Sequence, residues 1–339
     1  MASDYETDPG SAGALREGVR RVRRNRYLGL VVNAAPSALW LTVFFLVPLG
    51  VMFYYSFGER GAFGQVLLGL SNIGLQQYAT FFVPEGATVP QAIWYSLAWM
   101  IEGVLPGGVE LAATDPTPYV KLTVKSINFA VVTTLVAFLI GYPMAYYLAR
   151  NVSSERQNLL IALVVLPYWA SYLVRIYAIK LLLSGNGIVP SLLVRLGVTD
   201  SPPQLLFTDF SVQFGLVYIW LPFMILPIYA SIENLDFTLQ EAAMDLGADR
   251  LDAFFKVTLP LSMPGVTAGS VLVFIPSVGA YVIPNLLGGP NTATIGNFIA
   301  GQFGAAGNWP LGAAASFVLM VIMLGVIAIY MRRAGGDLL

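Results

Sequence analysis

A stretch of 75 residues without a charged side chain, from Val257 to Met331, is the feature that most limits how this chain can fold. About 20 apolar helical residues cross a bilayer core, so the stretch is too long for a single span. The sequence Gly288-Gly289-Pro290-Asn291 interrupts it with residues that end helices. We therefore predict two membrane-spanning helices here, at about 263–286 and 311–331.

The composition of the whole chain agrees with a membrane protein. Of the 339 residues, 57% are hydrophobic and 11% are charged, whereas soluble domains have about 25% charged residues. A soluble cytosolic enzyme is therefore excluded. The net charge of −1 gives no reason to expect a nucleic-acid partner.

Three other uncharged stretches, and one interrupted only by Arg175 and Lys180, predict the remaining spans. They lie at about 36–57, 126–149, 157–183 and 210–232. We thus expect an all-α membrane protein with six transmembrane helices in a permease domain at 31–339, preceded by a cytoplasmic tail at 1–30. Two further segments are interpreted as parts of one large extracytoplasmic loop at 58–124: 61–84, which is uncharged but punctuated by Gly, Gln, Ser and Asn, and 91–105, which is too short to span and is expected to be a surface helix.

The distribution of Lys and Arg predicts the orientation, because these residues collect in cytoplasmic loops. Twelve lie on one side of the predicted spans: Arg16, Arg20, Arg21, Arg23, Arg24, Arg26, Arg150, Arg156, Arg250, Lys256, Arg332 and Arg333. Five lie on the other: Arg60, Lys121, Lys125, Lys180 and Arg195. Both termini are therefore predicted to be cytoplasmic. The first helix is expected to be an uncleaved anchor, because it exceeds the length of a signal-peptide core.

Several kinds of chemistry are missing from the sequence. It contains no Cys and no His, the usual thiolate and imidazole ligands and catalysts. It also lacks a Gly-Lys-Ser/Thr phosphate-binding loop. We expect no catalytic residue, no metal site and no cofactor in this chain, so that any ATP hydrolysis belongs to other subunits.

The loop between the fourth and fifth predicted spans, 233–262, has a recognisable design. Thr238 followed by Glu241 predicts a capping box that starts a helix. Gly247 fits the left-handed position that ends it. Asp249 then predicts the cap of a second short helix to about Lys256, stopped by Leu259-Pro260. The sequence predicts a rigid helix–Gly–helix elbow, and an amphipathic linker on the membrane surface is the alternative.

The spacing within this elbow resembles the EAA loop of ABC importer permeases. The matching residues are Glu241, Ala242, Ala243, Gly247, Leu259 and Pro260. The resemblance implies that the 238–256 segment is a coupling helix, with Asp245 on it, that docks into a cytoplasmic ATPase subunit. Independently of the family, a small Ala-Ala surface lets another backbone approach closely.

Further patterns resemble the first permease subunit of spermidine/putrescine-type importers, from helix 1 to the C-terminus. They are the segments Gly141–Tyr146, Leu166–Trp169, Leu173–Tyr177, Phe274–Gly279, Leu286–Gly289 and Asn308–Ala314. This family implies a type I importer permease fold. The sequence departs from the family pattern in two places: we expect an insertion at 84–117, and an acidic residue near Ala280 is missing.

Candidate residues of a substrate pathway come from the third, fourth and fifth helices. Ionisable side chains inside a span are costly and often functional, which selects Arg175 and Lys180. Snorkelling, or pairing with Asp200 or Asp209, is the alternative for both. Aromatic faces that attract cations are offered by Tyr168, Trp169, Tyr172, Trp220 and Tyr281. Packing or an interfacial belt is the alternative for these.

Prolines inside the predicted helices indicate kinks or breaks, because proline removes a backbone hydrogen bond. They are Pro143, Pro167, Pro222, Pro227, Pro276 and Pro284. Since Pro276 and Pro284 bracket Gly279, helix 5 is the first candidate for a bent, gate-forming helix. Gly265 and Gly269 near its start would allow close helix packing.

The resemblance implies a permease subunit of an ATP-driven importer in the prokaryotic inner membrane. Its expected partners are a second homologous permease, two ATPase subunits and an extracytoplasmic binding protein, within membrane lipid and without nucleic acid. A polyamine is the first substrate hypothesis, and amino-acid-like solutes or ferric complexes stay open. An ion-coupled secondary transporter is less favoured, because the predicted spans contain no acid for coupling.

Overall fold

A computed structural model describes residues 34–62, 64–68, 73–102 and 115–334. The chain divides into two units: the first ends at Tyr55, and the second begins at Ser56. The predicted tail at 1–30 and part of the predicted insertion at 84–117 lie outside the described residues. The positively charged N-terminal arginines lie outside them too.

The described part of the first unit is one helix, Ala34–Tyr55, long and apolar enough to cross a membrane. It contains a π-helical turn, η1 (Thr42–Leu46), followed by α2 (Val47–Tyr55). Pro48, the second residue of α2, has no N–H to donate to the preceding turn. The widened turn therefore lies where the regular hydrogen-bond ladder would be interrupted.

The second unit holds nearly all other elements. In chain order they are β1 (Glu59–Arg60), β2 (Val66–Leu67), α3 (Gln76–Phe82), α4 (Val89–Glu102), α5 (Pro118–Arg150), α6 (Ser154–Val165), η2 (Leu166–Trp169), α7 (Tyr172–Leu183), α8 (Ile188–Arg195), α9 (Asp209–Glu233), α10 (Thr238–Asp245), α11 (Arg250–Ala253), η3 (Phe254–Thr258), α12 (Leu259–Val278), α13 (Val282–Leu287), η4 (Pro290–Thr292), α14 (Ile295–Phe303) and α15 (Trp309–Ala334). β1 and β2 pair antiparallel, with Arg60 opposite Val66.

Six helical segments of the described chain are long and apolar enough to span a membrane. They are Ala34–Tyr55, Pro118–Arg150, Tyr172–Arg195, Asp209–Glu233, Arg250–Val278 and Trp309–Arg332. The prediction of an all-α, six-helix membrane protein is therefore confirmed for the described residues. The 14-residue helix α4, which covers most of the segment 91–105, is too short to be a further span.

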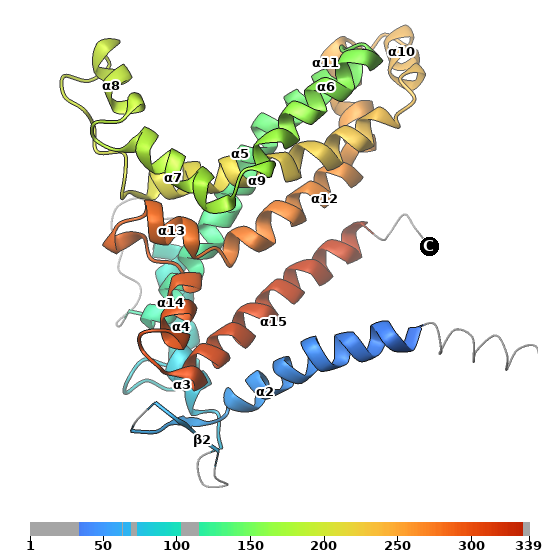
Figure 1. Ribbon diagram of the computed structural model, residues 1–339. Helices are drawn as coiled ribbons and strands as arrows, with labels where there is room; N and C mark the ends of the chain where they lie inside the picture. The colour runs from blue at the N-terminus through green and yellow to red at the C-terminus, as the bar shows by residue number, and fades with distance from the viewer. Residues whose placement is uncertain (1–33, 63, 69–72, 103–114, 335–339) are drawn as a thin grey trace, which may run out of the picture. The chain divides into compact units, whose positions relative to one another are not determined.

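Helices α5, α9 and α12 pack side by side and form the centre of the second unit (Figure 1). Small residues make this possible: Gly141 on α5 contacts Met224 and Ile225 of α9. Larger side chains such as Ile228 and Val273 fill the space between the helices and are fully buried. These three helices thus form a rigid frame that carries the loops at both ends.

The third predicted helix, 157–183, is not continuous, which corrects the sequence-based prediction. α6 ends at Val165, η2 follows, and α7 begins only at Tyr172. Pro167 removes a backbone donor in the middle of this region, and Ala170 adopts an extended conformation. The predicted helix 263–286 is also divided, between Val278 and Val282, as the prolines around Gly279 indicated.

α5 begins earlier than the predicted residue 126. Thr117 caps it by accepting a hydrogen bond from the Val120 amide at 3.3 Å, and Pro118 occupies the first turn, where proline is favoured. The Thr117 hydroxyl also donates to the Phe81 carbonyl at 2.5 Å. Lys121 and Lys125, predicted to lie beyond the helix, are consequently part of it.

Candidate functional site

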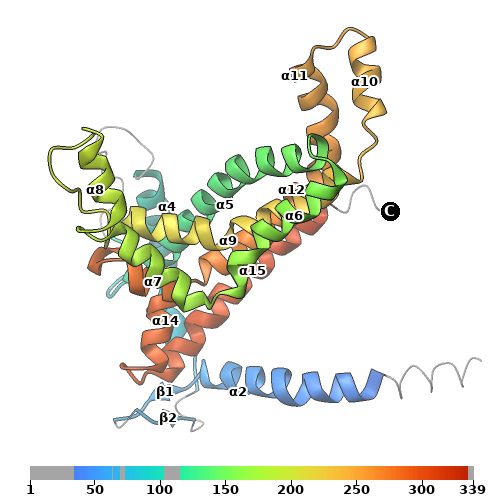
Figure 2. The same ribbon diagram turned by 45° about the horizontal axis from the view of Figure 1, so that its top comes forward.

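The predicted elbow is present as a helical hairpin at one end of the second unit, formed by α10 and α11 (Figure 2). Gly247 has φ +96°, the left-handed conformation predicted for it. Two hydrogen bonds close the end of α10, from the Ala248 amide to the Ala243 carbonyl at 3.1 Å and from the Gly247 amide to the Met244 carbonyl at 2.9 Å. This is a Schellman motif, which fixes the direction in which the chain leaves α10.

The start of α10 differs from the prediction. Thr238 makes no capping box with Glu241, because Thr238 is already the first helical residue. Instead, the Asp236 carboxylate accepts a hydrogen bond from the Thr238 amide at 3.0 Å. Hydrogen bonds from Thr238 hold the pKa of Asp236 below its ordinary value. The carboxylate is favoured here because a helix N-terminus attracts negative charge.

The second arm of the elbow begins as predicted but does not stop where predicted. The Asp249 carboxylate accepts from the Asp252 amide at 2.6 Å and caps α11. Leu259-Pro260 does not end the arm: one helical segment continues from Arg250 to Val278. The π-helical turn η3 immediately precedes Pro260, so the widened turn absorbs the missing proline donor.

The outward face of α10 combines small, apolar and acidic residues. Leu239 and Leu246 are 51% and 90% exposed, and helical geometry places Ala242 between them. Glu241 and Asp245 lie beside this stripe and are also exposed, while Ala243 is half-buried. A monomer gains nothing by exposing two leucines next to an alanine, so this face is suited to a protein partner.

The inward face of α10 is anchored to the end of α5. Gln240, which is 6% exposed, accepts a hydrogen bond from the Arg150 guanidinium. The same guanidinium lies over the Phe237 ring, 4.6 Å from its centre. A force applied to α10 therefore reaches α5 through Arg150 as well as α12 through the peptide chain.

Four of the predicted pathway residues gather where α6 and α7 meet α9. Arg175 is 8% exposed, and its guanidinium lies 4.2 Å from the Tyr168 ring centre and 6.0 Å from that of Tyr172. Trp220 packs against the same apolar cluster as Tyr172. Two guanidinium nitrogens, the Tyr168 hydroxyl and the Trp220 indole nitrogen are buried without a hydrogen-bond partner within the described residues. Such donors are costly in an apolar surrounding.

The ion pairs considered as an alternative for Arg175 and Lys180 are not formed in the part of the chain that the structure describes, and Trp169 lies away from the cluster around Arg175. Among the described residues neither Arg175 nor Lys180 forms an ion pair with Asp200 or Asp209. Lys180 lies over the Phe207 ring at 5.7 Å instead. Trp169 is 85% exposed and does not join the cluster.

Tyr281, the last pathway candidate, lies at the break between α12 and α13. Its carbonyl accepts from the Asn297 side chain at 2.9 Å, and the neighbouring Ala280 carbonyl accepts from the Thr294 hydroxyl at 3.0 Å. The Tyr281 carbonyl also accepts from the Asn285 amide of α13 at 3.0 Å, so the Asn297 and Thr294 side chains fasten the break to the start of α14. A cavity of about 510 Å³ beside the break is lined by Gly279, Tyr281, Gly296, Ile299, Ala300, Ser316, Leu319, Met320 and Met323.

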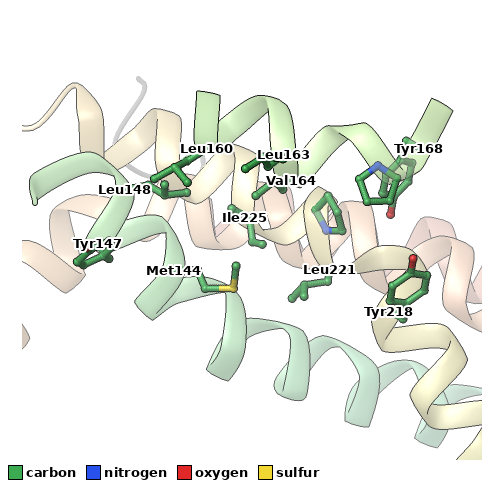
Figure 3. Close-up of a pocket in the computed structure, with 12 residues that line it drawn as sticks. Met144, Tyr147, Leu148, Leu160, Leu163, Val164, Tyr168, Tyr218, Leu221 and Ile225 are labelled. Carbon is green, nitrogen blue, oxygen red and sulfur yellow. The ribbon is translucent and has the colours of Figure 1, made fainter. Parts of the chain in front are cut away.

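A second cavity, of about 480 Å³, lies between α5, α6 and α9 (Figure 3). Tyr168 and Tyr218 lie at one end of it, and Tyr147 and Leu148 lie at the other. Aliphatic side chains such as Leu221 line the part between them. The cavity is suited to apolar contact rather than to a charged solute.

Comparison with known proteins decides the family. The model of the family described as binding-protein-dependent transport system inner membrane component matches residues 137–334, which include the whole elbow and the helix break at Gly279. The chain belongs to this family. It is therefore a multi-pass membrane permease subunit of an ABC importer, and the family's members are transport components rather than the catalytic subunits.

Individual relatives make the assignment finer. The spermidine/putrescine transport system permease protein PotB of Escherichia coli is 43% identical over 220 residues, which cover 65% of this chain and 79% of PotB. PotB of Haemophilus influenzae is 42% identical over 214 residues, 63% of this chain and 74% of that protein. The E. coli inner membrane ABC transporter permease protein YdcU is 35% identical over 237 residues, which cover 66% of this chain and 74% of YdcU.

A solved structure supports the type I permease fold. It is a bacterial ABC transporter involved in the import of the acidic polysaccharide alginate, with a TM-score of 0.66 over 93% of this chain and 99% of the other. The sequences are 16% identical, so this likeness concerns the fold. A related structure of the alginate transporter contains a periplasmic protein bound to an alginate pentasaccharide and has a TM-score of 0.67.

The sequence alone missed one polar feature of this permease. Lys125 of α5 and Asp209 of α9 form an ion pair of 3.0 Å. Asp209 was placed outside the span, but Thr208 and Ser211 form a capping box that makes Asp209 the first residue of α9. The Thr-x-x-Ser spacing was the available signal. In the described chain no three His, Cys, Asp or Glu residues lie close enough to hold a metal ion.

Proposed function

We propose that this permease subunit imports polyamines such as spermidine and putrescine, driven by ATP that other subunits hydrolyse. The identity to PotB, a spermidine/putrescine transport system permease protein, is the observation that carries the substrate class. Tyr168, Tyr172, Trp220 and Tyr281 supply aromatic faces for a cationic solute. Because the cavity beside Tyr281 has no carboxylate in its lining, charge compensation comes from elsewhere, including a second permease.

The sequence has no Gly-Lys-Ser/Thr phosphate-binding loop, so the proposed assembly includes other subunits that hydrolyse ATP. A second permease of the same fold pairs with this chain around the pathway, and two ATPase subunits dock from the cytoplasm. An extracytoplasmic binding protein delivers the solute to the ends of the helices opposite the elbow. The termini and the elbow then lie in the cytoplasm, in agreement with the distribution of Lys and Arg in the sequence.

The elbow is the proposed site of coupling to an ATPase. Its exposed face centred on Ala242 docks into a groove, and Glu241 and Asp245 contact polar groups at the rim. Gly247 holds α10 at a fixed angle to α11, so that closure of the ATPase pair moves α12. Leu259 and Pro260 belong to the continuous helix that passes on this movement. Arg175 and the surrounding aromatic residues lie along the proposed pathway.

The elbow is tested with Gly247→Pro and Glu241→Lys in the complete importer, reconstituted in vesicles with its partner subunits. Both variants are expected to reach the membrane normally but to lose ATP-dependent uptake. Asp200→Asn, on an exposed loop distant in sequence from the elbow, serves as the control and keeps uptake. Normal uptake by both elbow variants would refute the coupling role.

The substrate class is tested separately. The isolated binding protein of the same transport system is titrated with putrescine, spermidine, amino acids and ferric complexes. Tight binding of polyamines, with uptake of the same solutes into vesicles, supports the proposal. If only another solute binds, the chain is an importer permease for that solute. Uptake by this chain alone, without nucleotide and ATPase subunits, would favour an ion-coupled transporter.

A further inference from the structure

A small pocket of about 380 Å³ lies between α5 and α9, at the ends of these helices opposite the elbow. It is lined by Lys125, Asn128, Phe129, Val132, Asp209, Phe210 and Gln213. The pocket therefore combines a carboxylate, two amides and two aromatic rings. These are the groups that recognise an alkylammonium ion, through charge, hydrogen bonds and ring faces.

An ammonium group already occupies one side of this pocket. The Lys125 Nζ lies 3.0 Å from the Asp209 carboxylate and donates to the Asn291 carbonyl at 2.6 Å. It also lies 5.5 Å from the centre of the Phe129 ring. The Lys125 ammonium is thus held by a carboxylate, a carbonyl and a ring face, the three kinds of group that bind an alkylammonium ion.

The ion pair between Lys125 and Asp209 is weak enough for another ammonium group to replace Lys125. The side chains of Lys125 and Asp209 are 30% and 60% exposed, so water screens their attraction. Gln213 donates from its Nε2 to the Thr133 hydroxyl at 2.7 Å, which turns the amide so that its oxygen is the group left to accept. When Lys125 moves aside, the Asp209 carboxylate is free to accept from a second ammonium, with Gln213 in the lining of the same pocket.

We propose that this pocket binds a primary ammonium group of the transported solute, and that Lys125 is a tethered competitor that occupies Asp209 between transport cycles. The proposal rests on the proposed polyamine function and adds the place where the cation first meets the permease. Asp209 provides the carboxylate that the cavity beside Tyr281 does not have. In the empty pocket Lys125 neutralises Asp209; the solute displaces Lys125, which returns when the solute moves on.

The test measures equilibrium binding of radiolabelled 1,4-diaminobutane to the complete importer in lipid nanodiscs, without the binding protein. Lys125→Gln removes the competitor and is expected to tighten binding about twofold to fivefold, the range that an exposed ion pair gives. Adding Asp209→Asn to this variant removes the carboxylate and is expected to weaken binding about tenfold. Lys121→Gln is the matched control, because Lys121 lies one turn away on α5 and pairs with Asp115 at 2.5 Å.

Several results would contradict the proposed ammonium site. Weaker binding in Lys125→Gln would mean that the ion pair only fastens α5 to α9, and equal binding with and without Asp209→Asn would remove the carboxylate from recognition. Failure of every variant to bind the diamine would also overturn the proposal. Thermal unfolding of each variant verifies that it is folded. If the wild-type importer takes up no polyamine, the substrate class fails, while diamine binding to Lys125→Gln still decides whether this is an ammonium site.

Discussion

Gly265 of α12 lies directly against the backbone of α9: a Cβ atom at Gly265 would lie 2.5 Å from the Pro227 carbonyl oxygen. It would also lie 2.5 Å from the Ser231 Cβ atom. One turn further, Gly269 meets Met224 in the same way. The two glycines therefore set the distance between the helices, as their spacing in the sequence indicated.

Gly265→Ala is expected to destabilise the protein by about 1–3 kcal/mol, because α9 must move to make room for the methyl group. The measurement is the thermal unfolding temperature of the solubilised importer. Gly301→Ala is the matched control, since nothing lies within 4 Å of a Cβ atom there. An unfolding temperature for Gly265→Ala at or above that of the wild type would contradict the close-packing argument.

Arg150→Lys is expected to loosen α10 while keeping the positive charge. Lysine cannot lie flat over the Phe237 ring and bind Gln240 at the same time, and the lost stacking is worth about 0.5–1 kcal/mol. Hydrogen exchange of the α10 amides should accelerate accordingly. Arg156→Lys on α6, at an exposed position, should leave these amides unchanged. Identical exchange in both variants would show that Arg150 does not anchor the elbow.

The start of α10 should depend on pH through Asp236. Its pKa is lowered from the ordinary 3.8 by the hydrogen bonds from Thr238, so its stabilising effect is complete above pH 3.8 and is lost as the pH falls through the lowered value. Protection of the Thr238 amide, corrected for intrinsic exchange, should therefore decrease below about pH 4. Asp236→Asn retains a capping side chain and should remove this pH dependence. A dependence that persists in Asp236→Asn would assign it to another group.

Arg175→Met is expected to preserve or raise the free energy of unfolding, by about 1 kcal/mol, because it removes buried donors without partners and fills a similar volume. Its uptake of solute should nevertheless fall if Arg175 lines the pathway. Measuring unfolding and uptake on the same preparation separates the two effects. Arg175→Lys retains the charge and serves as the comparison. Full uptake by Arg175→Met would assign Arg175 to packing alone.

Features set by local chemistry were predictable from the sequence. The six apolar spans follow from hydropathy, and Gly247 follows from the one conformation that only glycine adopts without strain. The cap at Asp249 was equally local. At the start of α10, Asp236 and Thr238 are both good caps two residues apart, and local rules could not decide between them.

Features set by long-range contacts were not predictable. Lys125 and Asp209 meet because α5 and α9 pack in parallel, and nothing in the sequence near either residue indicates this register. The same holds for the burial of Arg175 against Tyr168, which depends on where the chain turns at η2. Pro167 marked this turn as a kink, but whether a proline bends or breaks a membrane helix depends on its neighbours.

The uninterrupted helix from Arg250 to Val278 has a mechanical consequence. Its 29 residues extend about 44 Å at about 1.5 Å per residue, longer than a bilayer core is thick. Because every residue of this segment is helical, a movement of α11 is passed along it to Val278, although Pro260, Pro264 and Pro276 each remove a backbone hydrogen bond. Lys256 and Val278, near the two ends of this segment, therefore move together, and the first break in the helix comes at Gly279, close to Tyr281.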